Sequence, residues 1–168
     1  CYRECGSKDA VLFADAVMGM GFSMSTRAGI SICIDDMEIP ESKREIIQRA
    51  EEEVLRYQSR FNNGYLTENE KYNHVVDLWT NTTNTVAKNL FSDISVENIV
   101  DEYGNQVLLP DGTAAQQDSF NSIYMMVDSG ARGSQTQIRQ LAGMRGLMSK
   151  PNGEIIETPI TANFREGL

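Results

Sequence analysis

The chain has 168 residues, of which 40% are hydrophobic, and its formal net charge at pH 7 is −9. One sizeable core can form at this length, whereas no apolar run reaches the ~18 residues of a membrane span and no signal-peptide pattern opens the chain, so we expect a cytoplasmic protein. Residues 1–120 hold 10 basic and 20 acidic side chains, against 5 and 4 in residues 121–168, which argues against nucleic-acid wrapping by the first part.

A helix is predicted over residues 8–28, because apolar residues recur there at spacings near 3 and 4. They are Val11, Leu12, Phe13, Ala16, Val17, Met20 and Phe22. We expect this helix to be buried and to be interrupted around Gly19 and Gly21. Residues 29–40 begin apolar, turn acidic and end at a proline, which is typical of a short strand followed by a loop.

The sequence gives little support for a metal site. Cys1 and Cys5 are followed by no second pair, Cys33 stands apart, and His74 is the only histidine. Reduced structural thiols are therefore favoured over a zinc site or a disulfide framework. The acidic residues 35–38 could hold a cation, but a solvated loop is the favoured interpretation.

Two long helices are predicted next, each beginning with the capping-box pattern Ser/Thr-x-x-Glu. The first begins at Ser42, with Glu45 as its reciprocal partner, and its apolar stripe is Ile47, Ala50, Val54, Tyr57 and Phe61. A turn follows, in which Gly64 is free to take a positive φ. The second begins at Thr67, with Glu70, and its stripe is Tyr72, Val76, Trp79, Thr83, Val86 and Leu90. Stripes of this kind, joined by a short turn, predict an antiparallel helical hairpin over about residues 42–90.

The remaining segments are shorter. Residues 91–118 are polar, with turn-like pieces at 101–106 and 109–113, and we expect a surface excursion with a short hairpin. Ser134 is placed to cap a helix running to about Met148, and a turn at 150–153 then leads into an extended stretch. The fold class is therefore mainly α, with a long helical hairpin, further helices and a small extended segment near the C-terminus.

Glycines and small residues surround Arg132 just before the predicted helix at Ser134. Such a turn can hold an anion, although an ordinary turn is the commoner outcome for this pattern. Arg132 and Arg139 are seven residues apart and would share a helical face if the helix began early enough. That spacing suits a ligand with several phosphates, and the alternative is a solvated or ion-paired face.

Three unusual strings occur in order: Asp-Ser-Gly-Ala-Arg-Gly-Ser at 128–134, Gln-Ile-Arg-Gln-Leu-Ala-Gly-Met-Arg-Gly-Leu at 137–147, and Thr-Pro-Ile-Thr-Ala-Asn-Phe-Arg-Glu-Gly-Leu at 158–168. Together they resemble the segment of the bacterial RNA polymerase β′ subunit that lines the nucleotide entry channel and leads to the bridge helix. The string Gly-Tyr-Leu-Thr-Glu-Asn-Glu-Lys-Tyr-Asn at 64–73 resembles the helical rim around that channel. The resemblance implies a piece of a larger subunit.

The resemblance assigns roles to residues at matching positions. It implies that Arg132 and Arg139 contact the phosphates of entering nucleoside triphosphates or departing pyrophosphate. Residues that would support closure of the active site are Arg145, Met148 and Lys150. Residues that would dock channel-binding regulators, of the Gre and DksA types, are Glu70, Lys71, Tyr72, Asn73 and Asp77. Trp79 and Val76 are instead expected to form the internal seam of the hairpin.

The resemblance also implies a division of labour. Residues 1–118 would form the funnel and rim hairpin, and residues 119–168 the channel-lining helix and the junction to the bridge helix. The other polymerase subunits (α, β, ω and sigma), and DNA and RNA through the whole enzyme, would be the partners, with no membrane contact. The magnesium-binding string of this family and its zinc-binding cysteine clusters are absent from the chain, so Mg²⁺ and Zn²⁺ are implied only for the full subunit. The chain by itself is expected to be inactive, and a stand-alone helical adaptor is the alternative function.

Overall fold

The computed structural model describes residues 2–101, 105–109 and 113–167, and these fall into two compact units that divide between Ile32 and Cys33. The helices are α1 (Tyr2–Ala28), α2 (Lys43–Asn62), α3 (Glu68–Ser95), α4 (Ser122–Asp128) and α5 (Gln135–Ile138), and a π-helical turn, η1 (Arg139–Gly143), follows α5 directly. Two short strands, β1 (Val96–Asn98) and β2 (Gln116–Asp118), pair antiparallel. The mainly α fold predicted from the sequence is confirmed. The functional division at residue 118 stays a prediction.

The first unit is the helix α1, and two expectations about it were wrong. Gly19 and Gly21 do not interrupt the helix; the non-helical residue is Gly6, with φ 86° and ψ 177°. A glycine inside a helix costs only about 1 kcal/mol relative to alanine, so a helix can run through one. No residue of α1 is buried, because the described residues of this unit contain no second helix or strand for it to pack against.

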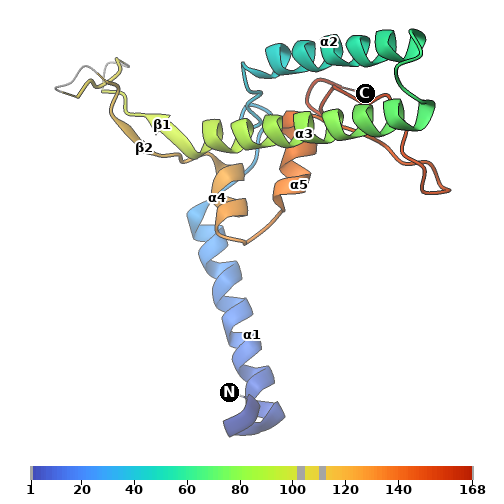
Figure 1. Ribbon diagram of the computed structural model, residues 1–168. Coiled ribbons are helices and arrows are strands. Elements are labelled where there is room, and N and C mark those ends of the chain that lie inside the picture. Colours follow the sequence, from blue (N-terminus) through green and yellow to red (C-terminus); the bar gives the residue numbers. More distant parts are fainter. Residues whose placement is uncertain (1, 102–104, 110–112, 168) are drawn as a thin grey trace. The chain divides into compact units, whose positions relative to one another are not determined.

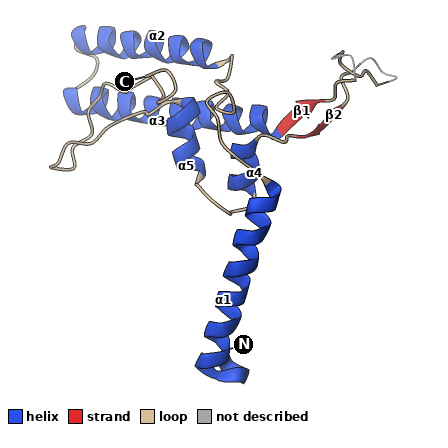
Figure 2. Cartoon of the chain, turned by 180° about the vertical axis from the view of Figure 1, so that it is seen from behind, coloured by secondary structure: helices blue, strands red, loops and turns tan. Residues whose placement is uncertain are grey.

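The second unit is built on the antiparallel pair α2 and α3, which lie alongside each other (Figures 1 and 2). A first core cluster fills their interface and consists of Ala50, Val75, Trp79, Val86 and Met144. Burying one such large apolar side chain contributes roughly 1.5–3 kcal/mol. The predicted hairpin and the burial of Trp79 in its seam are therefore confirmed. Gly64 closes the turn with φ 76°, as expected.

The two predicted capping boxes have opposite outcomes. At α3, Thr67 N donates to Glu70 Oε2 (2.9 Å) and Glu70 N donates to Thr67 Oγ1 (3.3 Å), so the box is confirmed. At α2 the prediction of a capping box is wrong. Ser42 itself has helical angles (φ −65°, ψ −15°) and makes no side-chain cap. Its hydroxyl accepts from Asn89 Nδ2 (3.1 Å) on α3, and Glu45 pairs with Arg49 on its own helix.

A second core cluster joins the end of α3 to α4, α5 and η1. Its buried members are Leu90, Ile94, Ile123, Ile138 and Ala142. Asn121 caps α4, because its Oδ1 accepts from the N–H groups of Ile123 (3.0 Å) and Tyr124 (3.2 Å). Ser134 caps α5 in a capping box with Gln137, as the sequence indicated for Ser134.

The helix that begins after Ser134 is shorter than predicted. We expected it to reach about Met148, but helical structure ends at Gly143, and Met144 is extended (φ −146°, ψ 151°). The cause is pairing with a distant segment, since Gly146 and Ile160 exchange two backbone hydrogen bonds of 2.9 Å. We call residues 146–160 the C-terminal hairpin. It contains the predicted turn, in which Gly153 N donates to Lys150 O (2.9 Å), and the predicted extended stretch.

The helix α3 extends to Ser95, so residues 91–95, expected to belong to a surface excursion at 91–118, are helical instead, and Ile94 is buried in the second core cluster. Beyond α3, the described residues include the expected short hairpin, formed by β1 and β2. In the register of β1 and β2, Val96 lies opposite Asp118 and Asn98 opposite Gln116. The turns expected at 101–106 and 109–113 lie partly outside the described residues, as do Cys1 and the end of the last motif at Leu168.

Candidate functional site

A buried polar network joins the start of α2, the end of η1 and the last turn of the chain. The side chain of Asn163 is fully buried, and its Nδ2 donates to the carbonyl oxygens of Ala142 (2.8 Å) and Gly143 (3.2 Å). Two further hydrogen bonds join Asn163 to Glu166: Asn163 N donates to Glu166 Oε2 (2.9 Å), and Glu166 N donates to Asn163 Oδ1 (2.8 Å). Asn163 thus satisfies carbonyl groups that the end of η1 would otherwise leave unpaired.

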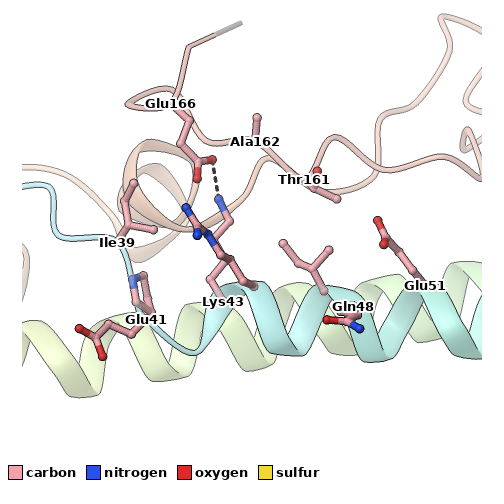
Figure 3. Close-up of a pocket in the computed structure, with 11 residues that line it drawn as sticks. Ile39, Glu41, Lys43, Gln48, Glu51, Thr161, Ala162 and Glu166 are labelled. Carbon is pink, nitrogen blue, oxygen red and sulfur yellow. Dashed lines mark hydrogen bonds and ion pairs between the residues drawn. The ribbon is translucent and has the colours of Figure 1, made fainter.

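Lys43 completes this network from the first turn of α2. Only 4% of Lys43 is exposed, and its Nζ lies 2.6 Å from Glu166 Oε2. A dashed line marks this ion pair in Figure 3. Burial raises the pKa of Glu166, but the bonds from Lys43 and Asn163 and the charges of Lys43 and Arg44 together hold that pKa below its ordinary value. The carboxylate therefore stays ionised and keeps the buried ammonium group paired.

A cleft of about 970 Å³ opens beside this ion pair, between α2 and the segment around Thr161 (Figure 3). Its wall mixes apolar side chains such as Ile39 and Ile47 with both cations and carboxylates, among them Arg44 and Glu51. Because neither charge sign dominates, the wall does not select one class of charged ligand.

The two arginines expected to line the channel lie in different settings. Arg132 is exposed in the turn before α5. The helical face that the sequence spacing suggested for Arg132 and Arg139 is therefore not formed. The capping box at Ser134 fixes the helix start two residues after Arg132 and excludes that arrangement. Arg139 is half-buried at the start of η1, and its Nε is buried without a hydrogen-bond partner among the described residues. An unsatisfied buried donor of this kind costs about 1–3 kcal/mol.

The three residues expected to support the active site lie on the strand-like segment after η1. The guanidinium of Arg145 stacks over the ring of Phe164 at 4.8 Å from its centroid. Met148 is exposed, and Lys150 pairs with Glu154 across the turn (2.9 Å). The structure therefore gives Arg145 a packing partner on the last motif, while Met148 remains available to another molecule or segment.

The five residues expected to dock regulators divide into two groups. Glu70, Asn73 and Asp77 are exposed near the start of α3. Lys71 and Tyr72 instead face the C-terminal hairpin: Lys71 Nζ lies 3.3 Å from Glu157 Oε2, and Tyr72 OH donates to Ile155 O (3.0 Å). His74, in the same turn, stacks on Tyr57 with ring centroids 5.0 Å apart.

Several residues of this region were not singled out from the sequence. Asn163 and Glu166 lie inside the motif at 158–168, and their place in that motif is the one signal in the sequence that singles them out. Lys43 had no such signal, because its environment depends on Glu166, which is far away in the chain. In the part of the chain that the structure describes, no three His, Cys, Asp or Glu side chains are grouped to hold a metal ion. None of the described helices combines the length and apolarity needed to cross a membrane.

Comparison with known proteins identifies the family. The profile of the family described as RNA polymerase Rpb1, domain 4, matches residues 66–165. The DNA-directed RNA polymerase subunit beta' of Dechloromonas aromatica is 55% identical over 99% of the chain, and those of Hydrogenovibrio crunogenus and Stutzerimonas stutzeri are 55% identical over its full length. The chain spans 11% of the length of each of these relatives. The chain therefore belongs to the RNA polymerase Rpb1 domain 4 family and matches one segment of the bacterial β′ subunit.

Proposed function

We propose that this chain works as part of DNA-dependent RNA polymerase, which transcribes DNA into RNA from the four ribonucleoside triphosphates. The observation that supports this most strongly is the 55% identity to a β′ subunit over 99% of the chain. The α, β, ω and sigma subunits would be its partners in the cytoplasm, with DNA and RNA bound by the whole enzyme. This similarity disfavours the alternative of a stand-alone adaptor.

Within that enzyme, we propose that the chain lines the nucleotide entry channel. Arg132 and Arg139 would contact phosphates, and each has a feature that suits this role. Arg132 is exposed, and Arg139 has a buried donor that no described residue satisfies. A guanidinium group binds phosphate oxygens through paired N–H donors, so both side chains have the right chemistry. Arg145, Met148 and Lys150 would support closure of the active site from the segment after η1.

The test replaces Arg132 or Arg139 by alanine in the assembled polymerase. Loss of one charge-assisted hydrogen bond, worth about 1.5–3 kcal/mol, raises the nucleotide concentration needed for elongation by roughly tenfold to a hundredfold. Arg49→Ala is the matched control, because Arg49 is exposed and already paired with Glu45. Elongation and pyrophosphorolysis with wild-type substrate dependence in both variants would show that these arginines do not contact phosphates.

We also propose that the start of the α3 helix docks channel-binding regulators of the Gre and DksA types. Glu70, Asn73 and Asp77 present exposed polar groups there, close to the turn of the hairpin. The variant Glu70→Lys reverses one charge and is expected to weaken regulator binding while basal RNA synthesis stays near normal. Glu70→Gln is the control for the helix start, because glutamine can still close a capping box. Equal regulator affinity in wild type and Glu70→Lys would remove the docking role.

The chain alone is expected to synthesise no RNA. Its sequence lacks the carboxylate-rich string on which this family binds catalytic magnesium. A template-dependent synthesis assay with the purified chain measures this directly. RNA made by a preparation free of other polymerase subunits would contradict the proposed division of labour.

A further inference from the structure

A second, smaller cavity lies between α3 and the α5–η1 segment. Its volume is about 380 Å³, near the lower end of the roughly 300–1,000 Å³ typical of small-molecule sites. Lys88 and Asn84 line it from α3, and Arg139 and Gln135 line it from the opposite side. Phe91 supplies an apolar part of the wall.

The sequence spacing explains why these polar groups meet in one place. Asn84 and Lys88 are four residues apart on α3, so they lie on the same face of that helix. Gln135 and Arg139 are also four residues apart, along the continuous helical path of α5 and η1. Two helical faces, each with one cation and one amide, therefore line the same cavity.

The charge in this cavity is positive and uncompensated. No carboxylate is among its lining residues, and neither Lys88 nor Arg139 forms an ion pair with any described residue. The contrast with other lysines of the unit is clear, since Lys43, Lys71 and Lys150 each pair with a glutamate.

Arg139 adds a directional feature to this charge. Its Nε is buried and has no hydrogen-bond partner in the described part of the chain. A buried donor on a cation is satisfied best by an anionic acceptor, because charge-assisted hydrogen bonds are about twice as strong as neutral ones. The neighbouring cavity, which shares Phe91 and Gln135, is lined by the carboxylate of Asp128, so it lacks the purely cationic lining of the Lys88–Arg139 cavity.

We propose that the cavity binds a phosphate group, held jointly by the Lys88 ammonium and the Arg139 guanidinium. The amides of Asn84 and Gln135 and the hydroxyl of Thr136 would supply further donors. The inference rests on the proposed function in one respect, since it keeps a phosphate role for Arg139, but it names Lys88 rather than Arg132 as the partner. The phosphate belongs either to free pyrophosphate or to the triphosphate tail of a nucleotide.

The test uses the assembled polymerase with Lys88→Gln, Arg139→Gln and the double substitution. The rate of pyrophosphorolysis at increasing pyrophosphate concentration gives the apparent binding constant for pyrophosphate. The rate of elongation at increasing nucleotide concentration gives the apparent binding constant for nucleotide. Each single variant is expected to weaken pyrophosphate use about 5- to 30-fold. The double variant is expected to lose less than the product of the two single effects, because both groups hold one ligand. Lys88→Arg keeps the positive charge and should retain most of the pyrophosphate use that Lys88→Gln loses. Arg49→Gln is the control and should change either apparent binding constant less than about twofold.

The outcomes distinguish free pyrophosphate from the triphosphate tail as the ligand. They also distinguish the Lys88–Arg139 site from the proposed channel role of the arginines. A change confined to the pyrophosphate constant identifies free pyrophosphate as the ligand, and a parallel change in the nucleotide constant identifies the triphosphate tail. Wild-type constants in Lys88→Gln, with a defect in Arg139→Gln, would overturn the paired site while leaving the proposed channel role of Arg139 intact. Wild-type constants in Arg139→Gln and Arg132→Ala together would overturn both.

Discussion

Replacing Asn163 by alanine is expected to destabilise the second unit more than its small size suggests. Asn163 is fully buried, and its side chain takes part in three hydrogen bonds. Two of them satisfy the carbonyl oxygens of Ala142 and Gly143 at the end of η1, and the third accepts from Glu166 N. Alanine leaves all three backbone groups without this partner in a place that is largely closed to water.

The magnitude follows from this arrangement. A lost intramolecular hydrogen bond costs about 0.5–1.5 kcal/mol, and a buried group left unsatisfied costs about 1–3 kcal/mol. Part of this loss is recovered where water reaches Glu166, whose side chain is 37% exposed. We therefore expect the free energy of unfolding to fall by about 2–4 kcal/mol, which is large for one substitution.

Urea unfolding followed by tryptophan fluorescence measures this effect. Trp79 is the only tryptophan of the chain and is buried in the first core cluster, so its emission reports on the second unit. With a slope of about 2 kcal/mol per M, the midpoint is expected to fall by about 1–2 M urea. Asn81→Ala is the control, because Asn81 is exposed on α3 and its substitution should stay within about 0.5 kcal/mol. Equal midpoints for the two variants would refute the role assigned to Asn163.

Two further predictions use the same unfolding assay. The pKa of Glu166 is lowered on folding, so its ion pair stabilises the chain above pH 4.5, and the advantage of wild type over Glu166→Gln should shrink as the pH falls below that value. A constant difference from pH 7 to pH 3 would contradict this. Gly146→Ala should cost about 1–3 kcal/mol more than Gly153→Ala. Both glycines have positive φ, but a Cβ at Gly146 lies 3.1 Å from Thr83 Oγ1, whereas a Cβ at Gly153 meets nothing within 4 Å. Equal losses in the two variants would show that Thr83 moves aside.

The capping patterns show how far local sequence determines local structure. Thr67-x-x-Glu70 and Ser42-x-x-Glu45 are equivalent as strings, yet only the first forms the reciprocal box. The difference is tertiary, because Asn89 on the neighbouring helix donates to the Ser42 hydroxyl. The apolar stripes predict the hairpin but not all of its contacts. Ala50, Trp79 and Val86 pack in the first core cluster as expected, whereas Val75 is the buried member there in place of Val76, and Leu90 packs in the second cluster.

The early end of the helix after Ser134 has a similar origin. Its sequence continues with residues compatible with a helix, but Gly146 pairs with Ile160 and Asn163 binds the last carbonyl groups of η1. Those partners are about 14 to 21 residues away, beyond the reach of any argument from periodicity. The shared helical face considered for Arg132 and Arg139 fails for a local reason, because the capping box at Ser134 starts the helix after Arg132. The shared cavity of Arg139 and Lys88 could not be predicted, because it joins segments far apart in the chain.

The five residues assigned to regulator docking are not equivalent probes of that role. Lys71 and Tyr72 connect α3 to the C-terminal hairpin through Glu157 and Ile155, so replacing either one also removes one of these two contacts. The C-terminal hairpin carries Met148 and Lys150, which we assign to active-site support. A loss of regulator response in a Lys71 or Tyr72 variant would therefore combine weaker docking with the loss of a contact to that hairpin. Exposed residues with no such connection, such as Asp77, isolate the docking surface.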